Sequence, residues 1–131
     1  MNEMYRFFIL AFPFCNGYIS IENHTMTDFP TGITAGEDRI YITSTSMKKL
    51  TTSRLNHFYQ LQRLSIRKAK LTSFPDLSPV ASTLVYVGFS KTWIQYVDEA
   101  YVKILTSLED FTWNYNLFVE HFPFHALPPT I

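Results

Sequence analysis

Histidine and carboxylate side chains are the groups in this chain that could bind a metal ion or transfer a proton. The sequence has four histidines and 11 acidic residues, and only His121 and His125, in the stretch HFPFH, lie close together. Two histidines at this spacing can bind one metal ion when both lie on one face of a helix. Pro123 stands between them, and proline disfavours a helix through this stretch. We therefore expect no metal site and no cofactor.

Nucleophilic chemistry is not favoured by the sequence either. Serine and histidine occur without the strand, turn and helix pattern of a nucleophile elbow. The four glycines do not form a phosphate-binding loop. Cys15 is the only cysteine, so no disulfide can form within the chain. The sequence predicts that the protein is not an enzyme and directs attention to binding.

The bulk composition narrows the kinds of partner. The 131 residues fit one domain. Lys and Arg number 11, and Asp and Glu also number 11, so there is no basic excess of the kind that drives nucleic-acid binding. Charged residues make up 17% of the chain, whereas 12 Phe, 8 Tyr and 2 Trp are many for this length. Much apolar surface must be buried or shared with a partner.

Residues 1–17, MNEMYRFFILAFPFCNG, have the layout of a short signal peptide. Arg6 precedes an apolar run, and small residues at Cys15 and Gly17 offer a cleavage site. A glutamate before Arg6 and a proline in the run weaken this pattern. A retained first strand of an intracellular protein is the alternative interpretation. The run is shorter than the ~20 residues that span a bilayer, so no membrane span is expected.

Asn23 begins Asn-His-Thr, an acceptor pattern for glycosylation. The pattern has meaning only if residues 1–17 direct secretion. Asn23 is therefore a candidate glycosylation site that depends on the signal-peptide interpretation.

The spacing of apolar residues recurs along the chain. In residues 61–77, LQRLSIRKAKLTSFPDL, apolar side chains follow one another at steps of 3, 2, 5 and 3, which fits neither a helix nor a single strand. The same rhythm occurs five times. Its fourth-position residues lie 21, 24, 23 and 24 positions apart, at Ile19, Ile40, Leu64, Val87 and Phe111.

This pattern resembles the leucine-rich repeat family, whose repeats run Leu-x-x-Leu-x-Leu-x-x-Asn-x-Leu. The resemblance covers residues 18–122 and is to extracellular-type repeats of 21–24 residues. It implies an α/β fold, a right-handed leucine-rich repeat solenoid or horseshoe arc with a parallel concave β-sheet and short helical or irregular convex segments. We expect about five repeats over residues 18–131, with a strand centred on each fourth-position residue.

The segments between the expected strands differ from one another. Apolar spacing predicts helical turns near 53–59 and 98–105, whereas residues 74–84, with two prolines, are expected to be irregular or to form a short 3-10 turn. Candidate N-caps precede the helical turns, namely Thr52 or Ser53, and Asp98.

The ninth position of a family repeat is usually Asn, whose side chain satisfies backbone groups in the turn after the strand. This chain departs from that pattern, because only the last repeat keeps Asn, and Ala69 offers no side-chain hydrogen bond. We expect water or neighbouring backbone to replace that bond. The five ninth-position residues are His24, Thr45, Ala69, Thr92 and Asn116.

The family's extracellular members usually have disulfide-bonded end caps, which a chain with one cysteine cannot build. The resemblance therefore implies that the last coil exposes apolar residues that something must cover. Self-association through the C-terminal coil and a tail, residues 123–131, that folds back over it are both open. The residues concerned are Trp113, Phe118, Phe122 and Phe124.

In the family, the outward strand residues form an exposed concave face that holds a partner. The corresponding positions here are rich in Tyr and Arg, which are frequent interface anchors. A basic group lies at the centre, with Glu22 and Asp110 at the edges, and a protein ligand with an acidic patch would suit it. The candidate partner-binding residues are Arg39, Tyr41, Arg63, Arg67, Lys68, Tyr86, Lys91, Asp110 and Tyr115.

The sequence thus predicts a protein-recognition module that is secreted or part of an extracellular receptor. The alternative is an intracellular, cytoplasmic leucine-rich repeat scaffold that retains its N-terminal strand. Both interpretations exclude nucleic acid as the partner, because the chain has no net charge.

Overall fold

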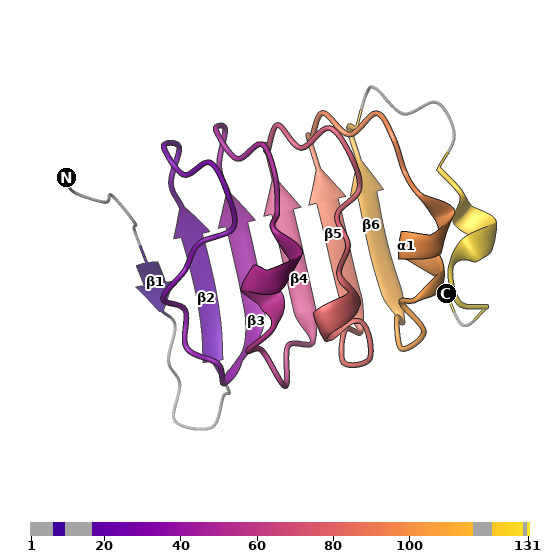
Figure 1. Ribbon diagram of the computed structural model, residues 1–131, viewed down its shortest axis with the longest axis horizontal. Coiled ribbons are helices and arrows are strands. Elements are labelled where there is room, and N and C mark those ends of the chain that lie inside the picture. Colours follow the sequence, from indigo (N-terminus) through magenta and orange to yellow (C-terminus); the bar gives the residue numbers. More distant parts are fainter. Residues whose placement is uncertain (1–6, 10–16, 117–121, 130) are drawn as a thin grey trace.

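The computed structural model describes residues 7–9, 17–116, 122–129 and 131, which build one six-stranded sheet (Figure 1). The strands lie in the order in which they occur along the chain. β1 is antiparallel to β2, and β2 to β6 are parallel, so the chain is α/β with a five-stranded parallel sheet and few helices. The strands are β1 (Phe7–Ile9), β2 (Gly17–Glu22), β3 (Glu37–Thr43), β4 (Arg63–Arg67), β5 (Tyr86–Ser90) and β6 (Asp110–Asn114).

The register of the parallel strands confirms the five strand positions predicted from the apolar spacing. Each predicted central residue is paired with the next, in the row Ile19, Ile40, Leu64, Val87 and Phe111. Two positions further along each strand lies a second row, Ile21, Ile42, Ile66, Phe89 and Trp113. Since side chains alternate between the faces of a strand, both rows point to the same side of the sheet.

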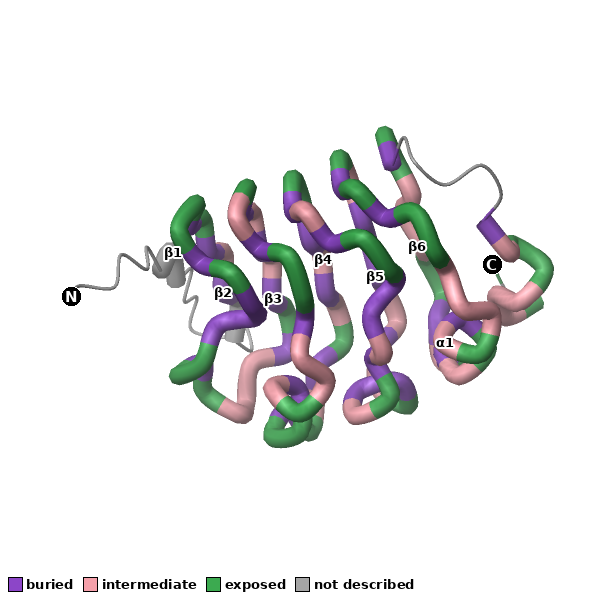
Figure 2. Tube along the Cα trace, turned by 45° about the horizontal axis from the view of Figure 1, so that its top comes forward, coloured by how far each residue is buried: buried purple, intermediate pink, exposed green. Residues whose placement is uncertain are grey.

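The segments that connect the strands pack on that side and leave the other side open (Figures 1 and 2). Among the described residues these segments carry two short 3-10 helices and one α-helix, and a third 3-10 helix follows the last strand. The helical turn predicted near 98–105 is an α-helix, whereas the one predicted near 53–59 is a 3-10 helix that ends at Leu55. The two-proline segment forms the expected 3-10 turn. These helices are η1 (Thr52–Leu55), η2 (Ser78–Val80), α1 (Glu99–Lys103) and η3 (Phe124–Ala126).

One predicted N-cap is confirmed and the other is wrong. Asp98 caps α1, because its Oδ1 accepts a hydrogen bond of 2.9 Å from the backbone N–H of Ala100. The prediction of Thr52 or Ser53 as the cap of η1 is wrong, since Thr51 occupies the N-cap position without a side-chain cap bond. The hydroxyl of Thr51 donates instead to Asp28, on the preceding connecting segment. A contact between two segments thus replaces the local cap.

The core lies between the sheet and the connecting segments. Leu64 and Val87 are fully buried, as predicted, and the connecting segments add buried residues such as Phe29, Phe58 and Leu105. Burial of one side chain of this size contributes about 1.5–3 kcal/mol. The strands and the segments that cover them therefore stabilise each other through one shared apolar layer.

Hydrogen bonds join the connecting segments at the N-terminal end of the core. Asp28 is 7% exposed, and its Oδ1 accepts from the backbone N–H groups of Phe29 at 2.6 Å and Thr51 at 2.9 Å. The guanidinium of Arg54 lies 3.8 Å from its Oδ2. Burial alone would raise the pKa of Asp28, but the hydrogen bonds from Thr51 and Phe29 and the charge of Arg54 outweigh it and hold the pKa below 3.8.

Aromatic rings cover the C-terminal end. Phe122 is only 8% exposed, and its ring centroid lies 4.6 Å from that of Trp113 and 5.0 Å from that of Phe111. In η3, His125 forms an ion pair of 3.1 Å with Glu99 of α1. Residues 122–129 turn back over this end, as one of the two open alternatives predicted, and Phe122 is therefore buried (Figure 1). Phe124, 58% exposed, stays on the surface as expected.

Several sequence predictions fall outside the described residues. Phe118, His121 and most of the proposed signal peptide belong to this group. Of residues 1–17, the structure describes β1, which pairs Phe7 with Ile21 and Ile9 with Ile19, and Gly17 at the start of β2. This antiparallel strand was not part of the predicted five-stranded arrangement. None of the helices in the described ranges is long and apolar enough to cross a membrane.

Candidate functional site

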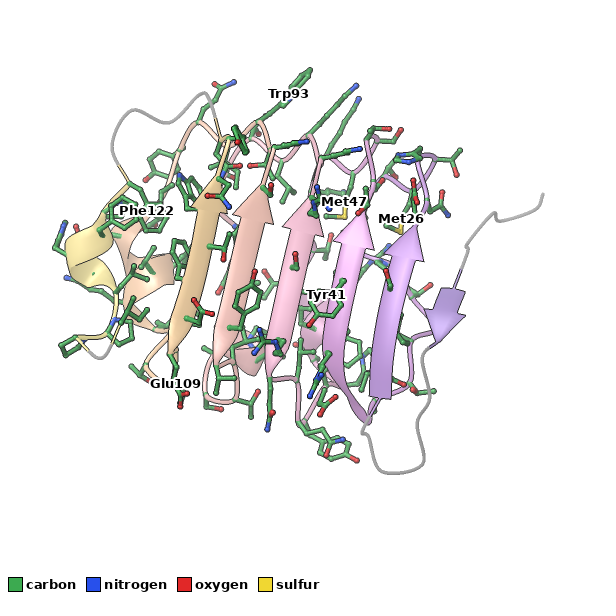
Figure 3. All side chains as sticks on the ribbon, turned by 180° about the vertical axis from the view of Figure 1, so that it is seen from behind. Met26, Tyr41, Met47, Trp93, Glu109 and Phe122 are labelled. Atoms are coloured by element: carbon green, nitrogen blue, oxygen red, sulfur yellow. The ribbon has the colours of Figure 1, made fainter. Side chains whose placement is uncertain are left out.

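The side of the sheet away from the connecting segments is the candidate site, and we call it the open face. Figure 3 views the molecule from this side, with Tyr41 in front of the strands. The strand register aligns the outward residues in three rows. The outer row is Arg39, Arg63, Tyr86 and Asp110; the middle row is Ser20, Tyr41, Ser65, Gly88 and Thr112; the end row is Glu22, Thr43, Arg67, Ser90 and Asn114.

The structure places all nine predicted partner-binding residues on or beside the open face. Six of them are outward strand residues, and three directly follow a strand. Lys68, Lys91 and Tyr115 form this second group, after β4, β5 and β6 respectively. All three are exposed.

Lys68, Lys91 and Tyr115 adopt left-handed backbone conformations, with φ of 64°, 58° and 57°. Such a conformation costs a residue with a side chain of order 1 kcal/mol, and glycine is the usual choice. Backbone hydrogen bonds hold the first two, since the N–H of Lys68 donates to Ser90 and that of Lys91 to Asn114, both at 2.9 Å. The fold thus presents two ammonium groups and a phenol at equivalent places of successive turns.

A hollow of about 370 Å³ lies on the open face over β4, β5 and β6, and we call it the open-face hollow. Its floor is the small stretch of the middle row, Ser65, Gly88 and Thr112, and larger side chains stand around it. Four of the nine predicted residues line it, which are Arg67, Tyr86, Lys91 and Tyr115. The structure does not bring the other five into this hollow.

Gly88 allows Tyr86 to lie along the sheet. A Cβ at position 88 would come within 2.4 Å of the hydroxyl oxygen of Tyr86, closer than real Cβ contacts. The guanidinium carbon of Arg63 lies 4.6 Å from the centroid of the Tyr86 ring, within the range of a cation–π interaction. Gly88 therefore positions Tyr86, and Tyr86 in turn provides a surface for Arg63.

The open face carries more positive than negative charge. Five cations belong to it, against two carboxylates at Glu22 and Asp110. Among the residues that the structure describes, none of these five cations forms an ion pair, whereas Glu22 lies 3.0 Å from His24. The five cations are Arg39, Arg63, Arg67, Lys68 and Lys91.

Two of the ninth-position residues fix the turns beside this face. Asn116 is buried, accepts from the backbone N–H of Thr92 at 2.9 Å and donates to the carbonyl of Phe89 at 3.0 Å. His24 acts in a similar way, since its Nδ1 accepts from the backbone N–H of Thr45 at 3.1 Å. Asn116 thus satisfies backbone groups in the turn, as the resemblance implies for Asn at this position, and His24 makes one such bond at the other end of the sheet.

Sequence reasoning missed the floor of the open-face hollow. Ser65, Gly88 and Thr112 attract no attention singly, because small residues are ordinary on a solvated strand. The available signal was their position, since each occupies the same place in three successive strands. Tyr41 occupies the same place in β3, in register with Ser65.

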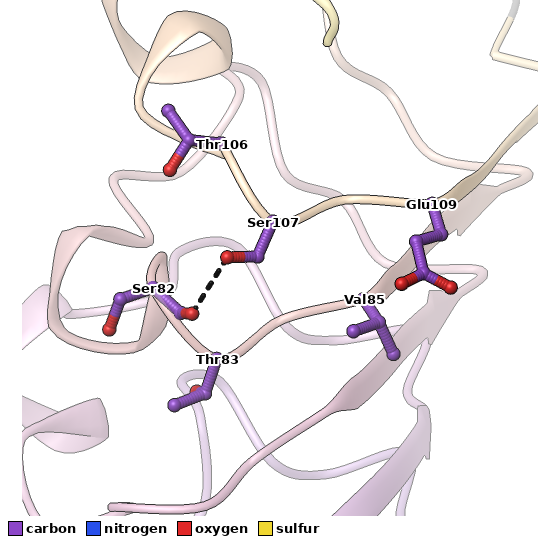
Figure 4. A pocket seen from close by; sticks show the side chains of 6 residues that line it. All are labelled: Ser82, Thr83, Val85, Thr106, Ser107 and Glu109. Carbon is purple, nitrogen blue, oxygen red and sulfur yellow. Dashed lines mark hydrogen bonds between the residues drawn. The ribbon is translucent and has the colours of Figure 1, made fainter. Parts of the chain in front are cut away.

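A second depression lies elsewhere, between the segments that precede β5 and β6 (Figure 4). Ser107 Oγ donates to the backbone carbonyl of Ser82 at 2.9 Å, and Glu109 is the single carboxylate in the lining. This arrangement offers no paired acid and base. Within the described ranges, no three metal-ligating side chains come together.

Asn23, the candidate glycosylation site, is only 4% exposed. Its Oδ1 accepts hydrogen bonds from the backbone N–H and the hydroxyl of Thr25, at 2.9 and 2.8 Å. Its Nδ2, the atom that would carry a glycan, is enclosed. The folded chain therefore does not present this atom to solvent.

No model of a known protein family, no characterised protein and no solved structure matches this chain.

Proposed function

We propose that this chain is a non-enzymatic protein-recognition module of the leucine-rich repeat type, and that its partner binds the open face. The spacing of apolar residues and the in-register parallel strands support a solenoid of such repeats. On this proposal the open face corresponds to the concave side of the arc. Secretion, or membership of an extracellular receptor, belongs to the same proposal.

One observation carries the proposal. Five cations on the open face lack an ion pair in the described part of the chain. Neighbouring like charges lower the stability of a sheet, and left-handed Lys68 and Lys91 add to that cost. A partner with complementary acidic groups would offset this cost on binding. Tyr86 and Tyr115 supply aromatic contact area beside the charges.

A peptide selection tests the proposal. Random peptides displayed on phage are selected against the folded chain, and each enriched peptide is measured against two double variants. Arg67→Glu with Lys91→Glu reverses charge on the open face. Lys48→Glu with Lys49→Glu makes the same change in net charge on exposed residues of the segment after β3.

We expect enriched peptides that are acidic, that lose binding to the open-face variant and that keep binding to the matched control. Equal binding to all three proteins would show that the selected surface lies elsewhere and would refute the proposal. Circular dichroism of the variants establishes that each remains folded.

A second candidate function is an intracellular leucine-rich repeat scaffold that retains its N-terminal strand. The observation that favours it is β1, which pairs with the free edge of β2. Removal of residues 1–17 would leave β2 as an unprotected edge, a known route to aggregation. N-terminal sequencing of protein from its native host separates the two candidates. A mature start near Tyr18 excludes the scaffold, and a start that includes β1 excludes a cleaved signal.

A further inference from the structure

We infer that the open-face hollow is a subsite for one anionic side chain of an acidic segment of a partner protein, held between Arg67 and Lys91. This inference rests on the proposed function and adds the chemistry of the ligand and its place. The open-face hollow combines a polar floor, two cations and two aromatic rings within about 370 Å³. A volume near the lower end for binding pockets suits one side chain and its neighbouring backbone.

The floor of the hollow and Ser90 beside it can donate hydrogen bonds to an anion. In the part of the chain that the structure describes, the side-chain hydroxyls of Ser65, Ser90 and Thr112 make no hydrogen bond to another protein group. Each hydroxyl has one proton to donate. An oxyanion in the hollow would therefore meet hydroxyl donors below it and cations beside it, and hydrogen bonds to a charged group are stronger than those to a neutral group.

The fold fixes the backbone positions from which the two cations extend. Arg67 ends β4, in register with Ser90 of β5, and Lys91 follows directly after Ser90. Neighbouring strands lie about 4.8 Å apart, so the two side chains start from adjacent positions and can reach one group together. Lys91 has a strained, left-handed backbone conformation. Such a conformation persists only where the surrounding structure fixes it.

The distribution of charge favours a local acidic group over a continuous polyanion. Glu22 lies at one side of the face and Asp110 at the other, so a polyanion that ran across all strands would meet both carboxylates. Positive charge is concentrated on β4 and just after β5, next to the hollow. A polypeptide segment with a few clustered acidic residues matches this arrangement, whereas a nucleic acid or a long sulfated glycan does not.

Fluorescence anisotropy with a labelled octaglutamate peptide tests the inference at low salt. Octaglutamine serves as the uncharged control peptide. Three variants probe the subsite: Arg67→Gln, Lys91→Gln and Ser65→Tyr, the last of which fills the floor without a change in charge. Two variants are controls, Arg39→Gln on the open face outside the hollow and Lys49→Gln off the face.

We expect octaglutamate to bind and octaglutamine not to bind. Each subsite variant should weaken binding roughly fivefold, and each control less than twofold. Ser65→Tyr distinguishes a shaped site from general electrostatic attraction. It leaves the positive charge of the face unchanged, so it should weaken binding only if the peptide enters the hollow.

The other outcomes separate the subsite from the proposed function. If Arg39→Gln weakens binding as much as Arg67→Gln and Ser65→Tyr has no effect, the subsite is wrong but an open-face partner stands. If Lys49→Gln weakens binding as much as the open-face variants do, both the subsite and the open-face partner are wrong. No binding of octaglutamate, or tighter binding of a heparin hexasaccharide at the same residues, overturns the acidic-segment inference.

Discussion

The segments at the two ends of the core are held by different interactions. At the N-terminal end, the side chains of Asp28 and His24 hydrogen-bond to the next connecting segment, Thr51 and Thr45 respectively. At the C-terminal end, Phe122 packs on Trp113 and Phe111 of the last strand. Directional bonds to a charged group depend on its protonation, whereas apolar packing depends on buried area and shape. The two ends should therefore respond differently to truncation, mutation and pH.

Removal of residues 123–131 should have the largest effect. It deletes η3 together with Ala126 and Leu127, which pack against the core, and leaves the last strand partly uncovered. Exposed apolar surface of this kind drives association. We expect static light scattering at high micromolar concentration to show aggregates for the truncated chain and not for the untruncated one. A truncated chain that stays monomeric would show that the tail is not needed as a cover. A dimer that survives truncation would instead support self-association.

Phe122→Ala should cost about 3 kcal/mol in the free energy of unfolding, because it removes a buried ring from an aromatic cluster. Phe124→Ala is the matched control. Phe124 follows Phe122 closely but is mostly exposed, so its loss should cost less than about 1 kcal/mol. Urea titration followed by tryptophan fluorescence measures both. Equal losses would mean that the C-terminal end is not closed by burial of Phe122.

Asp28→Asn should cost about 1–2 kcal/mol near pH 7, since hydrogen bonds to a charged group contribute more than those to a neutral one. The pKa of Asp28 in the folded state lies below its usual value, so its stabilisation is fully present above about pH 4 and is lost as the pH falls through the folded pKa. The difference between wild type and variant should therefore shrink below about pH 4. Urea unfolding at several pH values measures it.

Exposed Glu109→Gln serves as the control for that experiment. A difference between wild type and Asp28→Asn that stays constant from pH 7 to pH 3 would contradict the role given to the charge of Asp28.

Glu99→Gln should have the smallest effect. Hydrogen bonds from Lys103 and His125 lower the pKa of Glu99, but the side chain of Glu99 is 42% exposed and water screens its interactions. Because the pKa of Glu99 is lowered in the folded state, any stabilisation by this carboxylate is present at neutral pH and is lost as the pH falls. We expect no measurable change in the urea midpoint at pH 7, at low or high salt. A loss as large as that of Asp28→Asn would mean that charge, and not aromatic packing, holds the C-terminal end.

The strand positions were predictable because the inward rows must be apolar at every second residue. Leu64 and Ile66 illustrate this, since both are fully buried at the places that the rhythm indicated. The cap of η1 was not predictable in the same way. Thr51 bonds to Asp28, a residue 23 positions earlier, and no local rule for caps includes a distant competitor.

Part of the candidate site was predictable from the sequence and part was not. Its cations and tyrosines were identified from residue type and strand position, and all nine lie on or beside the open face. The open-face hollow was not identified from the sequence, because it forms only where Ser65, Gly88 and Thr112 lie in register on three neighbouring strands. The placement of Tyr86 over Gly88 likewise needs the side-chain conformation.

Residue order alone was enough to determine the spacing of the strands, the inward rows and the basic character of one face, because each depends on alternation within a short segment. The parallel arrangement of the strands was expected only from the resemblance to a repeat family. Three features depended on the folded chain: the antiparallel pairing of β1 with β2, the burial of Phe122 under the tail, and the open-face hollow. Each is made by residues of different elements of the chain. Their contact depends on the geometry of the whole core, which no local pattern of residues encodes.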